Sequence, residues 1–375
     1  MIVGVPKEIA PEEKRVAMVP EFVSKLKGVQ VAVQMGAGEA AGISDSEYEA
    51  KGATLARDAA ALYGQADLVV KVQPPTPAEA ALLKKGAASL SFLVPSACED
   101  SLKALAQRQA SVLSMTLMPR ISRAQFMDAL SSQATVAGYR SVMIAAESLP
   151  KFFPMMITAA GTVSPAKVFV VGAGVAGLQA IAVAHRMGAI VEAYDLRPAV
   201  KEQIESLGGK FVVLPLDAAD SQTAGGYAKA QSEDFYRRQR ELLAKAMQGS
   251  DVVITTALVP GKPAPKLVTE EAVRGLRAGS VVVDLAAEQG GNCALTEPGK
   301  TVVKHGVAIH GPLNPASALP AQASHLYARN IASFLDILIK DGKLELDEKD
   351  ELVRGTLVLR GGLAAEPAAA QGANK

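Results

Sequence analysis

The sequence predicts an α/β protein made of two domains, each built on a mostly parallel sheet. Short apolar runs rich in Val, Leu and Ile alternate with helical stretches along most of the chain. Such alternation is typical of consecutive βαβ units. The chain has 375 residues, of which 49% are hydrophobic, so it holds enough apolar material for two separate cores.

The first third of the chain contains the first series of strands and helices. Its apolar runs are brief and rich in branched residues, as expected for buried parallel strands. We expect strands at Ile2–Val5, Val29–Met35, Leu68–Val72, Ser89–Val94 and Ser111–Leu117. The pattern between and after them predicts helices at Pro20–Lys27, Asp45–Lys51 and Pro77–Lys84, and a longer one, after a polar start, between Arg120 and Leu149.

A second series begins after Ser164–Pro165, a dipeptide typical of a chain turn. Its strands are expected at Lys167–Val171, Ile190–Tyr194, Lys210–Val213, Asp251–Thr255 and Ser280–Asp284. From Gln322 to Lys340 apolar residues recur at helical spacing, and Gly342 suits the C-cap. We expect this helix to return to the first domain. The first domain then comprises residues 1–132 plus 322–375, with a mobile tail, and the second comprises residues 133–321.

The composition excludes several classes of protein. Lys and Arg number 39 against 38 Asp and Glu, and no basic patch occurs, so we expect no nucleic-acid partner. The N-terminus becomes charged too early for a secretory signal, and the longest apolar tract is broken by glycines, so no direct membrane span is expected. The two cysteines and four histidines lack ligand spacing, which predicts a cytoplasmic protein with reduced thiols and no metal.

A glycine-rich turn carries the strongest functional signal. From Lys167 the sequence reads KVFVVGAGVAG, a strand that runs into Gly172, Gly174 and Gly177 and then into a helix. In this setting the first glycine permits a tight turn, the second lets the backbone approach a pyrophosphate, and the third allows close helix–strand packing. The motif predicts a dinucleotide site at the helix N-terminus. We therefore expect two Rossmann-like domains flanking a cleft, with the nucleotide on the second.

Asp195 bears on the choice of nucleotide. It ends the next strand, 18 residues beyond Gly177, where a carboxylate accepts hydrogen bonds from the adenosine ribose hydroxyls. Its charge repels a 2′-phosphate, which favours NAD over NADP. Arg197 keeps the alternative open, because an arginine beside the strand tip can pair with a 2′-phosphate.

Several motifs together resemble the alanine dehydrogenase and transhydrogenase superfamily of NAD(H)-binding proteins. They are VGVPKE from Val3, RVAMVP from Arg15, GAGEAAGISD from Gly36, ADLVVKVQPP from Ala66 and AEQGGN from Ala287. The resemblance extends to about residue 340. In alanine dehydrogenases an arginine and a lysine bind the substrate, and they correspond to Arg15 and Lys71. The catalytic histidine of that branch is replaced by Val94, and the aspartate before Gln-Gly-Gly by Glu288.

The missing histidine favours the other branch. Oxidation of an amino acid needs a base, whereas hydride transfer between two nicotinamide rings needs alignment and exclusion of water. The resemblance thus implies the NAD(H)-binding subunit of a proton-translocating transhydrogenase. It implies a homodimer that lies at the cytoplasmic face of the inner membrane through separate partners, a transmembrane proton-conducting subunit and an NADP(H)-binding subunit. An amino-acid dehydrogenase and a non-catalytic NAD(H)-sensing module remain the alternatives.

The same resemblance assigns the site residues. The stretch MPRISRAQFMDALSSQ from Met118 is similar to a segment that surrounds the nicotinamide; spacing alone describes it as an ordinary helix start. Residues 217–238 are similar to a mobile loop that closes over the nucleotide. The implied catalytic residues are Arg120, Gln125, Asp128 and Tyr227. The implied NAD(H)-binding residues, besides the three glycines and Asp195, are Ser131, Ser132, Val175, Arg197, Gly226, Gln239 and Leu258, with Gln133 nearby.

Overall fold

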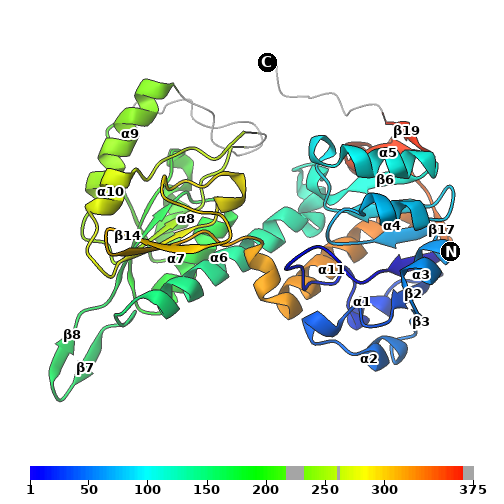
Figure 1. Ribbon diagram of the computed structural model, residues 1–375, viewed down its shortest axis with the longest axis horizontal. Helices are drawn as coiled ribbons and strands as arrows, with labels where there is room; N and C mark the ends of the chain where they lie inside the picture. Colours follow the sequence, from blue (N-terminus) through cyan, green and yellow to red (C-terminus); the bar gives the residue numbers. More distant parts are fainter. Residues whose placement is uncertain (217–231, 260–261, 366–375) are drawn as a thin grey trace. The chain divides into compact units, whose positions relative to one another are not determined.

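A computed structural model describes residues 1–216, 232–259 and 262–365. The chain forms two compact units, each built around one large sheet (Figure 1). The first unit combines Met1–Gln133 with Ser317–Lys375, and the second is Ala134–Ala316. The predicted fold class, α/β with parallel sheets and a discontinuous first unit, is confirmed.

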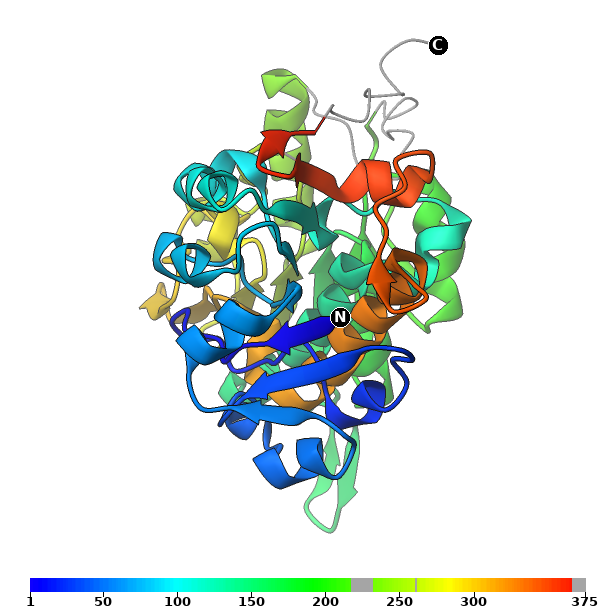
Figure 2. The same cartoon turned by 90° about the vertical axis from the view of Figure 1, so that its right-hand side faces the viewer.

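The first unit contains an eight-stranded sheet in the order β19-β18-β6-β5-β4-β1-β2-β3. The six strands from β6 to β3 pair in parallel, while β18 is antiparallel to β6 and to β19. Figure 2 shows these C-terminal strands in red at one end of the sheet. The strands are β1 Ile2–Val5, β2 Gln30–Gln34, β3 Thr54–Ala56, β4 Leu68–Val70, β5 Ala88–Ser91, β6 Ser111–Ser114, β18 Leu357–Arg360 and β19 Leu363–Ala364.

Helices cover both faces of this sheet because successive strand residues point to opposite sides. Leu68 and Val70 join a core with α11 and α12, whereas Val69 joins a core with α3, α4 and α5. The helices of this unit are α1 Pro20–Val23, α2 Asp45–Glu49, α3 Ala59–Gln65, α4 Pro77–Leu82, α5 Glu99–Gln107, α11 Pro320–Leu338 and α12 Glu351–Thr356. Short 3₁₀ helices are η1 Glu39–Ala41, η2 Pro95–Ala97, η3 Met115–Leu117 and η4 Ser122–Met127, and β16 Ile339–Lys340 pairs with β17 Lys343–Leu344.

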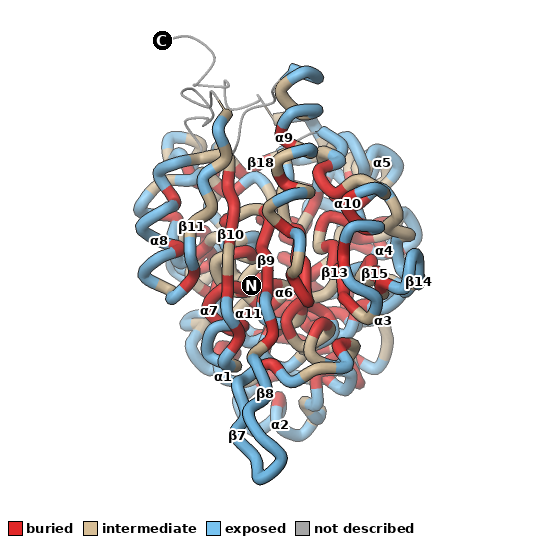
Figure 3. Tube along the Cα trace, turned by 90° about the vertical axis from the view of Figure 1, so that its left-hand side faces the viewer, coloured by how far each residue is buried: buried red, intermediate tan, exposed pale blue. Residues whose placement is uncertain are grey.

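The second unit contains a seven-stranded sheet in the order β11-β10-β9-β12-β13-β15-β14, in which only β14 is antiparallel to its neighbour. The central strands β10, β9 and β13 are largely buried (Figure 3). Val168 and Val170 face the core with α6 and α7, and Phe169 faces the core with α9 and α10. The strands are β9 Lys167–Val171, β10 Ile190–Tyr194, β11 Lys210–Phe211, β12 Val252–Thr255, β13 Val281–Asp284, β14 Thr301–Lys304 and β15 Val307–His310.

The helices of the second unit follow the βαβ order. They are α7 Val175–Arg186, α8 Lys201–Ser206, α9 Glu233–Ala246 and α10 Glu270–Arg274, with 3₁₀ turns η5 Pro198–Val200 and η6 Ala287–Gln289. A third 3₁₀ turn, η7 Pro315–Ala318, contains the second boundary between the units. Helix α6, Ala129–Ser148, contains the boundary between the units. A Cβ at Gly138 of α6 would lie 2.2 Å from the carbonyl oxygen of Ala176, so this glycine lets α6 pack directly on α7.

A hairpin extends from the second unit. Strand β7, Met156–Thr158, pairs antiparallel with β8, Gly161–Val163, and all six residues are exposed (Figure 3). Its apolar side chains are unusually accessible, since Ile157 is 77% exposed. Among the described residues, no helix has both the length and the apolar character needed to span a bilayer.

The helix predicted after a polar start between Arg120 and Leu149 is confirmed as α6, which begins at Ala129 after the 3₁₀ helix η4. Two strands, in contrast, end earlier than predicted. The strand predicted to end at Val94 ends at Ser91, and Val94 caps η2, which starts with Pro95. The strand expected to reach Val213 ends at Phe211, and Val213 is 73% exposed.

Candidate functional site

The three glycines of the turn after β9 have different surroundings. Gly172 adopts φ +97°, and a Cβ on Gly177 would lie 1.9 Å from the carbonyl oxygen of Gly172. Both positions therefore exclude a side chain. Gly174 is the N-cap of α7, and a Cβ added there meets nothing within 4 Å. The turn leaves open space where the first N–H groups of α7 begin, next to Val175, the first residue of that helix.

Asp195 follows β10 and holds this turn in place. Its Oδ2 accepts a hydrogen bond from the Ala173 N–H at 2.7 Å. Arg197 donates to both carboxylate oxygens, from Nε at 2.9 Å and from a terminal nitrogen at 2.8 Å. These hydrogen bonds to Asp195 raise the pKa of Arg197. The sequence alone did not decide whether the guanidinium of Arg197 binds a 2′-phosphate. In the structure it is bound to Asp195.

Gln239 is almost fully buried on α9. Its side chain is 3% exposed, and Nε2 donates to the Tyr194 hydroxyl at 2.9 Å. Burial raises the pKa of Tyr194 to about 12, so this hydroxyl stays protonated. The Oε1 atom of Gln239 is buried without a hydrogen-bond partner in the described part of the chain. A buried acceptor without a partner is costly.

The loop after β12 carries Leu258, which is 36% exposed. Asn292 holds this loop by a reciprocal pair of hydrogen bonds with the backbone of Ala257, at 2.9 and 2.8 Å. Asp284, at the end of β13, accepts from Thr255 Oγ1 at 2.9 Å and from Cys293 N at 2.9 Å. The sequence analysis did not identify Asp284 as a candidate. The signal that could have identified it is an aspartate at the end of a buried apolar strand.

The residues assigned to the nicotinamide lie at the start of α6 and just before it. Gln125 is exposed on η4, and Arg120, in the segment before η4, is exposed as well. Asp128 immediately precedes α6 and accepts from the Ser131 backbone at 3.0 Å and from its hydroxyl at 2.5 Å. The Asp128 carboxylate therefore stabilises the helix start, as the helix-start interpretation of this stretch expected.

Ser132 and Gln133 point into a buried polar network. Ser132 Oγ donates to Asn330 Oδ1 at 2.7 Å, and Gln133 Oε1 accepts from Arg15 at 2.8 Å. Asn330, on α11, was not singled out from the sequence, because it is one of several polar residues of this helix and belongs to no motif. Tyr227 and Gly226, which the resemblance places in a closing loop, lie outside the described residues.

The two cations that bind substrate in alanine dehydrogenases are engaged within this chain. Arg15 is 5% exposed and binds both oxygens of Glu13, at 2.8 and 2.6 Å. Lys71 is 1% exposed, and its Nζ lies 2.6 Å from Glu79 and 3.4 Å from Glu8. Val94, 47% exposed, offers no acid or base. Both cations are thus paired with carboxylates of this chain.

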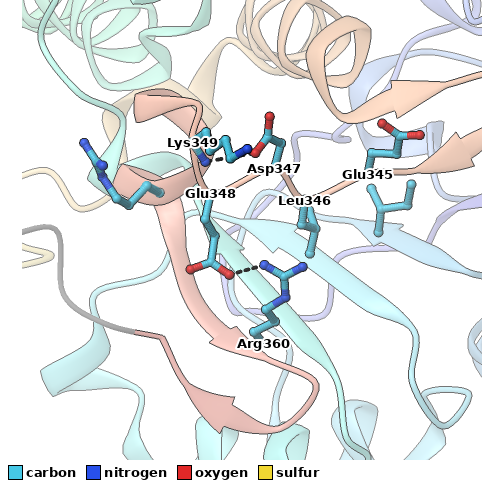
Figure 4. A pocket seen from close by; sticks show the side chains of 8 residues that line it. Glu345, Leu346, Asp347, Glu348, Lys349 and Arg360 are labelled. Atoms are coloured by element: carbon cyan, nitrogen blue, oxygen red, sulfur yellow. Dashed lines mark hydrogen bonds and ion pairs between the residues drawn. The ribbon is translucent and has the colours of Figure 1, made fainter.

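Metal-ligand clusters and surface hollows also bear on function. Within the described ranges, no group of three or more His, Cys, Asp or Glu residues is arranged to hold a metal ion. A shallow hollow in the first unit is lined by residues 344–349 with Arg354 and Arg360, and Glu348 pairs with Arg360 in its wall (Figure 4). None of the residues selected from the sequence lines this hollow.

Comparisons with known proteins agree with the motifs. Residues 4–137 match the family model "Alanine dehydrogenase/PNT, N-terminal domain", and residues 141–366 match "Alanine dehydrogenase/PNT, C-terminal domain". The chain is 51% identical to an NAD(P) transhydrogenase subunit alpha polypeptide of Rhodospirillum rubrum, over 98% of both chains.

Of two similar solved structures, a transhydrogenase resembles this chain more than an alanine dehydrogenase does. A transhydrogenase from Sinorhizobium meliloti superposes with a TM-score of 0.85 at 44% identity, covering 98% of this chain and 100% of that one. An L-alanine dehydrogenase superposes with a TM-score of 0.80 at 26% identity, covering 99% and 98%. The predicted family and branch are confirmed. The chain belongs to the alanine dehydrogenase/PNT family, in the branch of the NAD(P) transhydrogenase alpha subunits.

Proposed function

We propose that this chain is the NAD(H)-binding subunit of a proton-translocating transhydrogenase. In this role NAD(H) bound here exchanges a hydride directly with NADP(H) on a partner subunit. The observation that carries the proposal is the open space at Gly174, between two glycine positions that exclude side chains. A backbone cradle at a helix N-terminus fits a pyrophosphate.

The preference for NAD(H) rests on Asp195. Its carboxylate lies at the tip of β10 beside the glycine turn, where the ribose hydroxyls of a bound dinucleotide are recognised. We propose Gly172, Gly174, Val175, Gly177, Asp195, Arg197, Gln239 and Leu258 as residues that hold the nucleotide, together with Gly226 of the loop outside the described residues.

The reaction itself asks little of acid–base side chains. The hydride carries its electron pair from C4 of one nicotinamide to C4 of the other, so no proton is released from a substrate and no water is consumed. The buried, internally paired states of Arg15 and Lys71 fit this chemistry. We propose that Arg120, Gln125, Asp128, Ser131, Ser132 and Tyr227 align the dihydronicotinamide and exclude water from it.

The test combines this chain with the NADP(H)-binding component of a transhydrogenase. NADPH and the acetylpyridine analogue of NAD are supplied, and reduction of the analogue is followed by absorbance. We expect reduction that requires both proteins, and much less with Gly174→Val. NAD(H) binding without transfer at saturating nucleotide would favour the sensing module, and NADH formation from L-alanine would favour the dehydrogenase.

We also propose that the chain is a homodimer that lies at the cytoplasmic face of the inner membrane through its partners, as the family resemblance implies. The exposed hairpin β7–β8 supports the proposal of a dimer. An isolated two-stranded hairpin is only marginally stable in water, and its apolar side chains would be buried by contact with a second chain. The exposed apolar residues of the hairpin and its start are Met155, Met156, Ile157 and Val163.

Light scattering of the purified chain tests the dimer. We expect a dimer for the wild type and a monomer for Ile157→Asp, because a carboxylate at a residue that is 77% exposed disturbs only a contact with another chain. Val303→Asp, at a valine 68% exposed on β14, is the matched control and should stay dimeric. A wild-type monomer at micromolar concentration would contradict the proposal.

A further inference from the structure

Asn330 of α11 connects the two elements on either side of Asp128. The side chain is 6% exposed. Its Nδ2 donates to the carbonyl oxygen of Phe126 at 2.8 Å, at the end of η4. Its Oδ1 accepts from Ser132 Oγ at 2.7 Å, in the first turn of α6. One planar amide therefore holds the segment before Asp128 and the segment after it.

The segment needs such support. A 3₁₀ helix of six residues has poorer hydrogen-bond geometry than an α-helix, and its last carbonyls lack partners within the helix. Phe126 supplies one of these carbonyls, and its ring is 65% exposed, so packing of that ring does not fix the backbone. The buried amide of Asn330 satisfies this carbonyl instead.

A buried polar network adjoins the Asn330 amide through Ser132. Gln133 Nε2 lies 3.3 Å from Ser132 Oγ and donates to the Ala323 carbonyl at 3.1 Å, while its Oε1 accepts from Arg15. Arg15 is held in turn by both oxygens of Glu13. The Phe126 carbonyl can only accept a hydrogen bond, so the Asn330 amide turns Nδ2 toward it and Oδ1 toward Ser132. The Ser132 hydroxyl also lies 3.1 Å from the Ala129 carbonyl, and the shorter contact is the one to Asn330.

We propose that Asn330 is a positioning residue for hydride transfer. It acts through Phe126 and Ser132 and fixes the backbone that carries Gln125 and Asp128, without touching the nucleotide itself. The inference rests on the proposed function, in which those two residues align the nicotinamide. Misplacement of an aligning group by about 1 Å costs on the order of 100-fold in rate, so the amide matters to the rate although it is remote from the reacting atoms.

The kinetic test uses the full chain with its NADP(H)-binding partner. For Asn330→Ala we expect kcat to fall about 10- to 100-fold, with KM for the NAD analogue changed by less than about threefold. Ser324→Ala is the matched control: Ser324 is fully buried on the same helix and accepts from Val16 N at 2.9 Å, away from η4. Its kcat should remain within about twofold of the wild type.

Asn330→Asp makes the hydrogen bond to Phe126 depend on pH, and kcat is taken per folded protein so that loss of stability does not contribute. The introduced carboxyl has the same shape and donates to Phe126 only while it is protonated, so the ratio of its kcat to that of the wild type should fall as pH rises. In an Asp128→Asn background, Asn330→Ala should cost much less than in the wild type, because both changes act on the same segment.

Hydrogen exchange separates this inference from the proposed function. In Asn330→Ala we expect faster exchange across residues 122–133, and in Ser324→Ala no change there. If the wild type transfers no hydride, the proposed function fails, and a positioning role in that reaction fails with it even if exchange is accelerated. If the wild type is active, an unchanged kcat in Asn330→Ala or a pH-independent ratio in Asn330→Asp overturns the inference.

Discussion

Arg197 binds both carboxylate oxygens of Asp195, through Nε at 2.9 Å and a terminal nitrogen at 2.8 Å. The two side chains are 14% and 7% exposed. The acidic residue expected to favour NAD is therefore paired with the arginine that could bind a 2′-phosphate. Under the proposed function, we expect the preference for NAD(H) to depend on this ion pair remaining closed.

Asp195→Asn should weaken discrimination between the nucleotides. It removes the ribose acceptor charge and releases the guanidinium of Arg197, which is then free to meet a 2′-phosphate. We expect NADH affinity to fall about tenfold and the preference for NADH over NADPH to narrow by a larger factor. Nucleotide fluorescence titrations measure both. Glu192→Gln, whose exposed carboxylate pairs with Lys210 on the same sheet, is the control, and an unchanged NADH/NADPH ratio in Asp195→Asn would refute the prediction.

The second and third glycines should respond differently to substitution. Gly174→Val places its side chain in open space, so we expect an unchanged free energy of unfolding and a loss of NADH binding of more than about 30-fold. Gly177→Ala brings a Cβ within 1.9 Å of the Gly172 oxygen, which should destabilise the fold by about 2–4 kcal/mol. Urea denaturation and NADH titration distinguish them. Retained binding in Gly174→Val would show that no ligand occupies this space.

Glu8 predicts a pH dependence of stability. Burial raises its pKa from 4.5 to about 7, although the charge of Lys71 lowers it. Folding therefore favours the protonated form of Glu8. The contribution of this form to the free energy of unfolding is complete below pH 4.5 and is lost as the pH rises to about 7. We expect Glu8→Gln to remove this decline, which amounts to at most about 3 kcal/mol.

Urea denaturation between about pH 5 and pH 8 measures this effect. Glu13 affects stability in a different pH range. Burial raises its pKa, but hydrogen bonds from Arg15 lower the pKa to about 2. Its contribution to the free energy of unfolding is therefore lost only as the pH falls below 4.5. Glu39→Gln, at an exposed ion pair with Lys7, serves as control. A wild type and a Glu8→Gln variant with parallel pH profiles would disprove the assignment.

Restoring the histidine of the dehydrogenase branch should not restore that activity. In Val94→His we expect no NADH formation from L-alanine above background, because Arg15 remains bound to Glu13 and Lys71 to Glu79. Absorbance at the NADH band, with an authentic alanine dehydrogenase in parallel, makes the measurement. Measurable turnover of L-alanine would mean that these ion pairs open readily.

The alternation of apolar runs was enough to predict the parallel strands at the centre of each sheet. Lys167–Val171 and Ile190–Tyr194 were predicted with their observed bounds, because long branched runs between helical stretches have no competing structure. Strands β18 and β19 were not predicted. The antiparallel pairing of β18 with β6 joins residues more than 200 positions apart, and strands of only four and two residues form only beside such a partner.

The sequence by itself determined the α/β class, the glycine turn with its acidic strand tip and the family, since each depends on residue type at fixed local spacing. The tertiary structure decided which polar side chains form ion pairs and hydrogen bonds with other residues of the chain. Arg15, Lys71 and Arg197 all read as ligand-binding cations in the sequence, yet each is bound to a carboxylate in the fold. Asn330 acquires its place only because α11 packs against η4. Hydrogen bonds across long sequence separations are set by packing, which local patterns do not encode.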